Sequence, residues 1–229
     1  IIYWDGTVAS GVAEGSGTEE DPYIINTAAE LAWLVQQKAD VTDGNYYKVA
    51  DGIDTIVLQS KEKAKSIMAL DSAAEVKSYF ESGTFTAWKT TGWETACFAG
   101  YFDGNGATIY GMYATSTNNA ALFCTVDGGA AFVNLAIKNS YLTSSADNYQ
   151  VGALIGTSSS NGYGAKRDGI IWVKNITVAN NYLYNGCLST QITRSGVIGG
   201  AQEAIQVENA LVYGNDATYG RDSAIYDMP

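Results

Sequence analysis

A short series of strand-like segments recurs along the second half of the chain, and this recurrence limits the fold more than any single residue does. One copy spans residues 134–156, the next spans residues 175–199, and a third begins at Asn209. An earlier copy begins at Gly111. The starts are unevenly spaced, but the order of segments inside each copy is kept. Self-similar segments that are too short to fold alone indicate a solenoid.

Within each copy, apolar and polar residues alternate with the period of two that indicates a strand with one buried face. Stacking the copies in parallel would bury equivalent side chains in internal columns. The predicted columns are Met112, Leu135, Ile176 and Ala210; Ala114, Ile137, Val178 and Val212; and Leu122, Leu154 and Val197, with Phe123, Ile155 and Ile198 beside them. We therefore predict an all-β fold, a parallel β-helix, which is right-handed by the general preference of parallel crossovers.

An asparagine begins three of the copies, at positions 134, 175 and 209, and Gly111 takes the corresponding place in the earliest copy. Both residue types tolerate the left-handed backbone that a sharp corner requires. A polar ligand-binding face is the alternative interpretation. Because these residues recur in register with the apolar columns, we favour corners.

The chain is predicted to be a single β-helix domain in three parts: an N-terminal cap and lead-in (1–58), an insertion with a short helix (59–97) and the repeat coils (98–229). Thr27 and Glu30 form a capping-box pattern, which predicts a cap helix from Thr27 to Lys38. Ser72 and Glu75 predict a second short helix toward Phe80. Residues 61–65 are expected to form a solvated insertion, and residues 46–58 a strand leading into the coil.

Composition excludes several partners. Thirteen basic and 24 acidic residues give a net charge of −11, which repels nucleic acid and disfavours acidic polysaccharides unless calcium bridges them. No apolar run is long enough to insert into a membrane. The chain starts at Ile1 without a charged leader, so we expect one module of a larger multidomain protein.

No cofactor or metal site is predicted. Cys97, Cys124 and Cys187 match no metal-binding spacing, and a buried thiol is the expected role. Residues 103–106, Asp-Gly-Asn-Gly, resemble a calcium loop only superficially and are more simply a tight turn.

Catalysis is disfavoured because the chain has no histidine, which excludes Ser-His and Cys-His nucleophile systems. A glycosidase needs only two carboxylates. The available carboxylates, which do not cluster on one repeated face, are Glu19, Glu20, Asp21, Asp103, Asp127 and Asp168. A lyase would need a base, for which residues 166–168 in a glycine-flanked loop are the local candidate. We predict that the protein is not an enzyme, with a β-helix lyase or hydrolase as the weakest alternative.

Several segments resemble GLUG-motif-like bacterial surface and secreted β-helix repeat proteins. They are Trp4-Asp5-Gly6, residues 15–25, residues 27–32, Tyr47-Lys48-Val49, residues 102–112, Ala121-Leu122-Phe123 and residues 152–156. This resemblance implies a secreted or cell-surface bacterial location. The length and the same features also resemble xyloglucan-binding modules of plant-wall-degrading enzyme complexes. The chain departs from the common pattern in Cys124, where glycine is usual, and in the enlarged segment from Gln59 to Phe98.

Aromatic residues supply the candidate binding site. Tyr141 and Tyr182 occupy the same place in successive copies, so on strands about 4.8 Å apart their rings would form a ladder matching an extended glucan. A structural stack on the exterior is the alternative. Tyr184 would widen the ladder. The further candidates for ligand binding are Trp88, Trp93, Tyr163 and Trp172. Trp4 and Trp33 are expected to pack in the N-terminal cap instead.

The sequence therefore predicts a non-catalytic carbohydrate-binding module that recognises a neutral plant cell-wall polysaccharide, β-glucan or xyloglucan, through exposed aromatic residues. The alternative is a cell-surface adhesin or structural spacer that binds a protein partner. In the second case the tyrosines would only complete the surface.

Overall fold

The computed structural model describes residues 1–89, 97–145, 150–158, 169–186, 195–200 and 204–219. The helices within them are α1 (Ala28–Leu34), α2 (Ala39–Thr42), α3 (Lys61–Met68) and α4 (Ala73–Glu81). The strands of the first half are β1 (Ile2–Tyr3), β2 (Tyr23–Ile25), β3 (Tyr46–Val49), β4 (Thr55–Val57), β5 (Tyr101–Asp103), β6 (Thr108–Tyr110), β7 (Tyr113–Ser116) and β8 (Phe123–Val126). The remaining strands are β9 (Ala131–Lys138), β10 (Tyr141–Ser144), β11 (Val151–Ser158), β12 (Ile171–Ala179), β13 (Tyr182–Asn185), β14 (Ser195–Gly200), β15 (Ile205–Tyr213) and β16 (Asp216–Tyr219).

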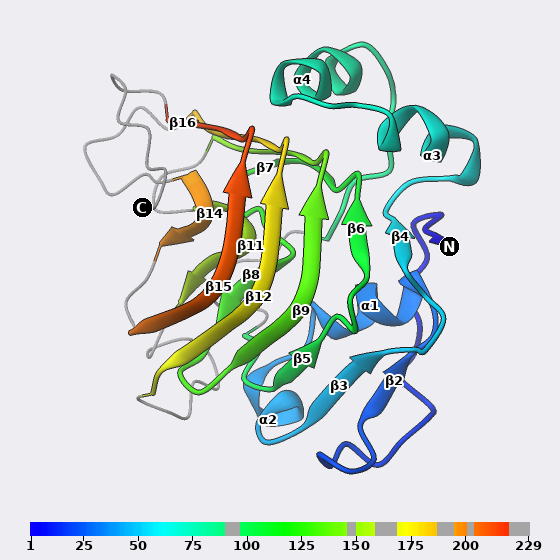
Figure 1. Ribbon diagram of the computed structural model, residues 1–229, viewed down its shortest axis with the longest axis vertical. Coiled ribbons are helices and arrows are strands. Elements are labelled where there is room, and N and C mark those ends of the chain that lie inside the picture. The colour runs from blue at the N-terminus through cyan, green and yellow to red at the C-terminus, as the bar shows by residue number, and fades with distance from the viewer. Residues whose placement is uncertain (90–96, 146–149, 159–168, 187–194, 201–203, 220–229) are drawn as a thin grey trace.

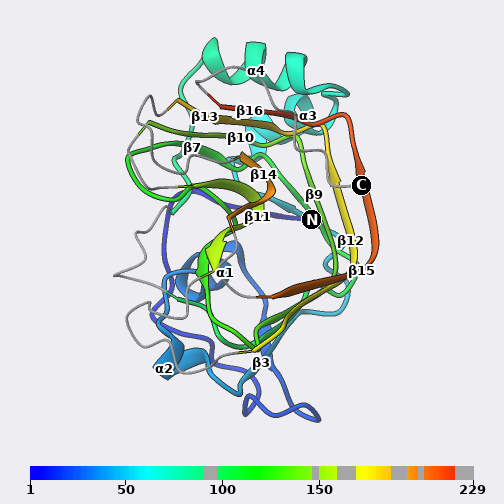
Figure 2. The same cartoon turned by 90° about the vertical axis from the view of Figure 1, so that its left-hand side faces the viewer.

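Every strand pair in the described residues is parallel, and the strands form sheets of nine, four and three strands. The large sheet has the order β1-β4-β6-β9-β5-β3-β2, with β12 and β15 continuing beyond β9. The four-stranded sheet has the order β16-β13-β10-β7, and the three-stranded sheet β14-β11-β8 (Figures 1 and 2). From β9 onward the chain passes through the large, four-stranded and three-stranded sheets in a fixed order and then repeats that order.

The predicted register is confirmed for the complete copies. Leu135 pairs with Ile176, and Ile176 with Ala210. In the three-stranded sheet, Ile155 pairs with Phe123 on one side and with Ile198 on the other. Ala210 itself is exposed, because among the described strands β15 pairs with β12 alone.

The assignment of the earliest copy is wrong by one strand. Ile109 of β6 pairs with Ile137, the position predicted for Ala114. Ala114 lies on β7 and pairs with Leu142 in the four-stranded sheet. The error arose because Gly111 has a left-handed backbone, with φ of 72°, as the asparagines that begin the other copies do. Two different bends of the chain require that conformation, and the sequence does not distinguish them.

The asparagine corners are confirmed. Asn134, Asn175 and Asn209 all have φ of 56°, and each bends a long strand of the large sheet. Their amides form a ladder in which Asn209 Nδ2 donates to Asn175 Oδ1 and Asn175 Nδ2 donates to Asn134 Oδ1, both at 2.8 Å. Asn134 Nδ2 donates to Asp103 Oδ1 at 3.0 Å, which continues the ladder to the turn after β5. The side chains therefore stabilise a backbone conformation that most residues resist.

The turn predicted at residues 103–106 is also confirmed. Asn105 and Gly106 have φ of 52° and 80°, and Ala107 N donates to Gly104 O at 2.9 Å. Within the described residues, no group of three or more potential metal ligands occurs. Cys97 and Cys124 are buried thiols, as predicted; Cys187 lies outside the described part of the chain.

The capping box of α1 is confirmed, with Thr27 and Glu30 bonded reciprocally, but the helix ends at Leu34 rather than Lys38. The predicted helix toward Phe80 is α4, capped by the Ser72 hydroxyl. Two interpretations of the N-terminal half are wrong. Residues 46–58 form two strands, β3 and β4, and residues 61–65 belong to α3, which buries Ala64 and Ile67.

Helices α3 and α4 form a layer over the outer face of the four-stranded sheet (Figure 2). The layer is fixed at the bend between β9 and β10, where Asn139 Nδ2 donates to the carbonyl oxygens of Ile67 and Leu70, both at 2.8 Å. Phe80 of α4 is 2% exposed and packs in a second hydrophobic cluster with Tyr141 and Tyr182. No helix in the described ranges is long and apolar enough to cross a bilayer.

Candidate functional site

A column of stacked tyrosines crosses the outer face of the four-stranded sheet. Parallel register aligns Tyr113, Tyr141 and Tyr182 on neighbouring strands. The ring centroids of Tyr113 and Tyr141 are 5.7 Å apart with an interplanar angle of 23°, and those of Tyr141 and Tyr182 are 5.1 Å apart at 21°. The predicted alignment of Tyr141 with Tyr182 is therefore confirmed. Tyr113 was missed, although it precedes Ala114 as Tyr141 precedes Leu142.

Helix α4 covers most of this column. The Phe80 ring is stacked 5.6 Å from Tyr113 at 10° and 6.0 Å from Tyr141 at 26°. Tyr141 and Tyr182 are only 8% and 7% exposed. Their ring faces are in contact with each other and with the helix, so they do not form the open platform that we expected.

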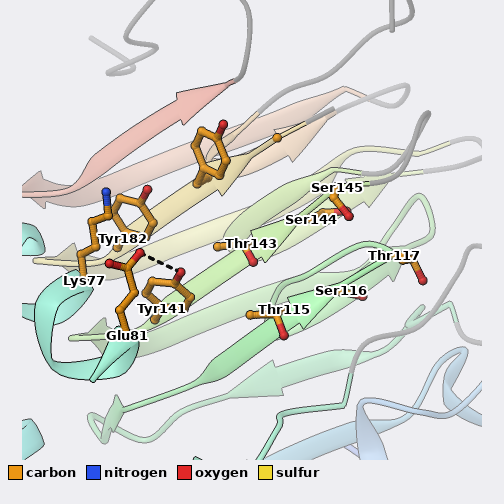
Figure 3. Close-up of a pocket in the computed structure, with 12 residues that line it drawn as sticks. Lys77, Glu81, Thr115, Ser116, Thr117, Tyr141, Thr143, Ser144, Ser145 and Tyr182 are labelled. Atoms are coloured by element: carbon orange, nitrogen blue, oxygen red, sulfur yellow. Dashed lines mark hydrogen bonds between the residues drawn. The ribbon is translucent and has the colours of Figure 1, made fainter. Parts of the chain in front are cut away.

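A groove lies beside the covered column, where the strands extend past α4. Its volume is about 650 Å³. Figure 3 shows Lys77 and Glu81 extending from α4 beside Tyr182 and Tyr141, with Thr115, Thr143 and the labelled serine residues farther along the strands. The full lining is Lys77, Glu81, Thr115, Ser116, Thr117, Tyr141, Thr143, Ser144, Ser145, Tyr182, Tyr184 and Gly186.

The residues on the floor of the groove are aligned across neighbouring strands, as the tyrosines of the column are. Thr115, Thr143 and Tyr184 are paired residues on β7, β10 and β13. The Tyr184 ring is half-buried and lies 6.3 Å from the Tyr182 ring at 19°. Thr143 Oγ1 donates to the Ala114 carbonyl oxygen at 3.4 Å. The floor thus combines one accessible aromatic ring with a series of hydroxyl groups.

The wall formed by α4 contributes one cation and one carboxylate. The Tyr141 hydroxyl donates to Glu81 Oε1 at 3.3 Å, and Lys77 Nζ lies 5.2 Å from the centre of the Tyr182 ring. Burial, reinforced by the charge of Glu81, raises the pKa of Tyr141 to about 12. Burial also raises the pKa of Tyr182, against the opposing effect of Lys77. Both phenols therefore keep their protons near neutral pH and remain hydrogen-bond donors.

Of the other aromatic candidates within the described residues, neither Trp88 nor Trp172 lines the groove. Trp88 is 2% exposed and packs edge-on against Trp4, with ring centroids 5.0 Å apart, so it offers no free ring face. Trp172 is 41% exposed but lies on the large sheet. Trp93 and Tyr163 lie outside the described residues. Trp4 is buried, as the cap interpretation requires, and Trp33 packs against the main core.

A second hollow of about 270 Å³ lies on the large sheet and brings Glu19 and Asp103 to one place, beside Tyr46 and Tyr101. We did not predict this proximity. Asp103 Oδ1 accepts hydrogen bonds from Asn105 N at 2.7 Å and from Asn134 Nδ2 at 3.0 Å, so this carboxylate already serves the turn and the asparagine ladder.

The remaining carboxylates from the sequence do not assemble with that pair. Glu20 and Asp21 are exposed and line neither hollow. Asp127 is buried and accepts from Gly128 N at 2.8 Å. Asp168 and the rest of the predicted lyase candidate at 166–168 lie outside the described residues.

Comparison with known proteins gives two distant relatives. The chain is 28% identical over 160 residues to Halomucin of Haloquadratum walsbyi, a match that covers 69% of this chain and 2% of that protein. It is 27% identical over 152 residues to a Gly-rich membrane protein of Evansella cellulosilytica, covering 66% of this chain and 15% of that protein. No family model matches the chain, and no solved structure matches it significantly. The chain thus spans only a small part of either relative.

Proposed function

We propose that the protein is a non-catalytic module that binds a neutral polysaccharide in the groove beside α4. The observation that carries this proposal is the composition of the groove. Its lining combines the Tyr184 ring with the side chains of Thr115, Thr117 and Thr143, and contains a single lysine and a single glutamate. Uncharged sugars offer hydroxyl groups and flat C–H faces, which such a surface complements.

The charge of the chain supports a neutral rather than an acidic ligand. The net charge of −11 repels polyanions, and Lys77 lies beside Glu81 rather than in a basic cluster. Among neutral polymers, we propose plant cell-wall β-glucan or xyloglucan, as the resemblance to xyloglucan-binding modules implies. Both have extended backbones that would run across the strands, along the repeating floor of the groove.

We also propose that the three parallel sheets are the faces of a right-handed parallel β-helix, with α1 covering one end. The fixed order in which the chain revisits the sheets supports the helix, and the preference for right-handed parallel crossovers supports the hand. A secreted or cell-surface location follows the resemblance to exported repeat proteins. The relative named as a membrane protein is consistent with this location.

The test is affinity electrophoresis in gels that contain xyloglucan, mixed-linkage β-glucan or pectin. We expect retardation by one of the first two polymers and none by pectin. Replacing Tyr184→Ala should weaken binding about tenfold, which corresponds to about 1.4 kcal/mol. The control is Tyr213→Ala, because Tyr213 is an exposed tyrosine on β15, outside the groove. Retardation by none of these polymers would remove the proposal, and release of reducing ends from the bound polymer would contradict a non-catalytic role.

A protein-binding adhesin or spacer is the second candidate, and the edge of the large sheet favours it. Within the described residues, β15 pairs on one side only, and it exposes Val207, Leu211 and Tyr213 at 39%, 56% and 46%. Open apolar strand edges pair readily with other chains. Sedimentation velocity tests this candidate, because self-association that Leu211→Lys abolishes would support a protein-binding edge.

A further inference from the structure

A second row of aromatic side chains crosses the large sheet, on a different face of the molecule from the groove. Parallel register pairs Tyr46 with Tyr101, Tyr101 with Ala131, and Ala131 with Trp172. These four residues lie on β3, β5, β9 and β12, which Figure 1 shows side by side. Gln206 of β15 pairs with Trp172 and extends the row by one strand. We call these five residues the sheet row.

The side chains of the sheet row point away from the core. Along β3 and β5, half-buried Tyr46 and Tyr101 alternate with the buried residues Tyr47 and Phe102. Along β12, Trp172 is 41% exposed between the buried residues Ile171 and Val173. The period of two in a strand sends such alternate residues to opposite faces. The aromatic members of the row are therefore on the outer surface together.

The spacing of the rings is regular. The Tyr46 and Tyr101 centroids are 5.0 Å apart with an interplanar angle of 32°. Trp172 lies two strands beyond Tyr101, which at about 4.8 Å per strand is about 10 Å. The small side chain of Ala131 lies between them, so no bulky group stands up from the sheet between the rings.

Two lysines beside the sheet row are paired with carboxylates, and two further carboxylates, Glu19 and Asp103, lie beside Tyr46 and Tyr101. The adjacent outward positions include Lys48 and Lys174; Lys48 Nζ lies 2.8 Å from Asp51 Oδ1, and Lys174 Nζ lies 3.0 Å from Glu208 Oε1. The two lysines are offset by their partners, and the remaining carboxylates repel an anionic ligand. The row therefore suits an uncharged ligand, and Gln206 supplies an amide for hydroxyl groups.

Cross-strand packing explains the tyrosine pair but not the whole row. Two aromatic residues opposite each other stabilise a sheet whatever the function. Packing does not require an exposed tryptophan in the same register two strands away, where it keeps its large apolar surface in water at a cost.

We propose that the sheet row is a second binding site, which takes the flat surface of an insoluble neutral polysaccharide. A polymer surface makes contacts at several points, and the sheet row offers three outward rings on strands of one sheet, with a shallow hollow at Tyr46 and Tyr101. The groove beside α4 suits a single soluble chain. The ligand class rests on the proposed function. The location rests on the sheet row alone.

The experiment measures depletion of the protein from solution by microcrystalline cellulose, in parallel with affinity electrophoresis in soluble xyloglucan. Tyr101→Ala combined with Trp172→Ala should lower the cellulose partition coefficient more than tenfold. The same variant should migrate in xyloglucan like the unaltered protein. Tyr184→Ala should show the reverse pattern, and Tyr213→Ala should change neither measurement.

The experiment distinguishes failure of the sheet-row site from failure of the groove site. Absence of cellulose binding by the unaltered protein, or cellulose binding that survives the double replacement, would overturn the sheet-row site whatever happens in xyloglucan. Loss of both activities in the double variant would also overturn it, because it would show a common site. Trp172→Ala alone is the control for misfolding of the double variant, because removing an exposed ring should lower stability only slightly. This single replacement should lower cellulose binding at least threefold.

Discussion

Replacing Asn175 tests whether the asparagine ladder stabilises the fold through its backbone conformation as well as its hydrogen bonds. Asn175 has φ of 56°, and its side chain donates to Asn134 Oδ1 and accepts from Asn209 Nδ2. Alanine in a left-handed conformation costs about 1–2 kcal/mol. Losing two exposed amide hydrogen bonds costs about 1 kcal/mol in total, at the lower end of the usual range. Asn175→Ala should therefore destabilise the protein by about 2–3 kcal/mol.

Asn175→Gly is the matched variant, because glycine loses the same hydrogen bonds but adopts positive φ without strain. We expect it to be about 1 kcal/mol more stable than the alanine variant. Thr177→Ala, on the same strand beyond the corner, should change stability by no more than about 0.5 kcal/mol.

The assay is urea unfolding followed by intrinsic fluorescence, with the midpoints compared at a common slope. For a slope of about 2–3 kcal/mol per molar, the alanine variant should unfold at about 1 M less urea. Equal stability of the alanine and glycine variants would refute the backbone argument and leave only the hydrogen bonds. An unchanged midpoint in both would show that the ladder contributes nothing.

Two further predictions concern buried groups. Phe80→Ala removes the ring that α4 places against Tyr113 and Tyr141. This change should lower the free energy of unfolding by about 3–5 kcal/mol and abolish ligand binding in the groove. Phe80→Leu should retain most of the stability and most of the binding. Hydrogen exchange in α4 would show the loss, and unchanged protection there would contradict it. Burial raises the pKa of Cys97 from 9.0 to about 12, so its contribution to stability is complete below about pH 9 and is lost as the pH rises toward 12. Urea midpoints measured from pH 8 to 11 should fall less steeply for Cys97→Ala than for the unaltered protein. Parallel curves for the two proteins would show that ionisation of Cys97 does not cause the loss of stability.

Local patterns predicted much of the repeat region because each repeat carries its own signals. Leu135, Ile137, Ile176 and Val178 alternate with outward residues, and their pairing follows directly once parallel stacking is assumed. The exception was the earliest copy. A left-handed residue at Gly111 matches either of two corners, and only the contacts of β6 with β9 decide between them.

The N-terminal half was harder to predict for a physical reason. A capping box marks where a helix begins, so Thr27 and Ser72 were identified correctly. Helix α3 has a mostly solvated surface, and its burial of Ala64 and Ile67 depends on a sheet formed much later in the chain. A short stretch of sequence around α3 does not contain the strands against which the helix packs.

The sequence by itself determined the strand alternation, the asparagine corners and the alignment of Tyr141 with Tyr182, because these depend on neighbours within a repeat or on its periodic return. Only the tertiary structure decided which tyrosines remain accessible. Helix α4 covers Tyr141 and Tyr182 and leaves Tyr184 beside the groove. The row of Tyr46, Tyr101 and Trp172 likewise exists only in the fold, since it joins residues from three separate strands. Exposure depends on what packs above a side chain, and the packing elements here come from distant parts of the chain.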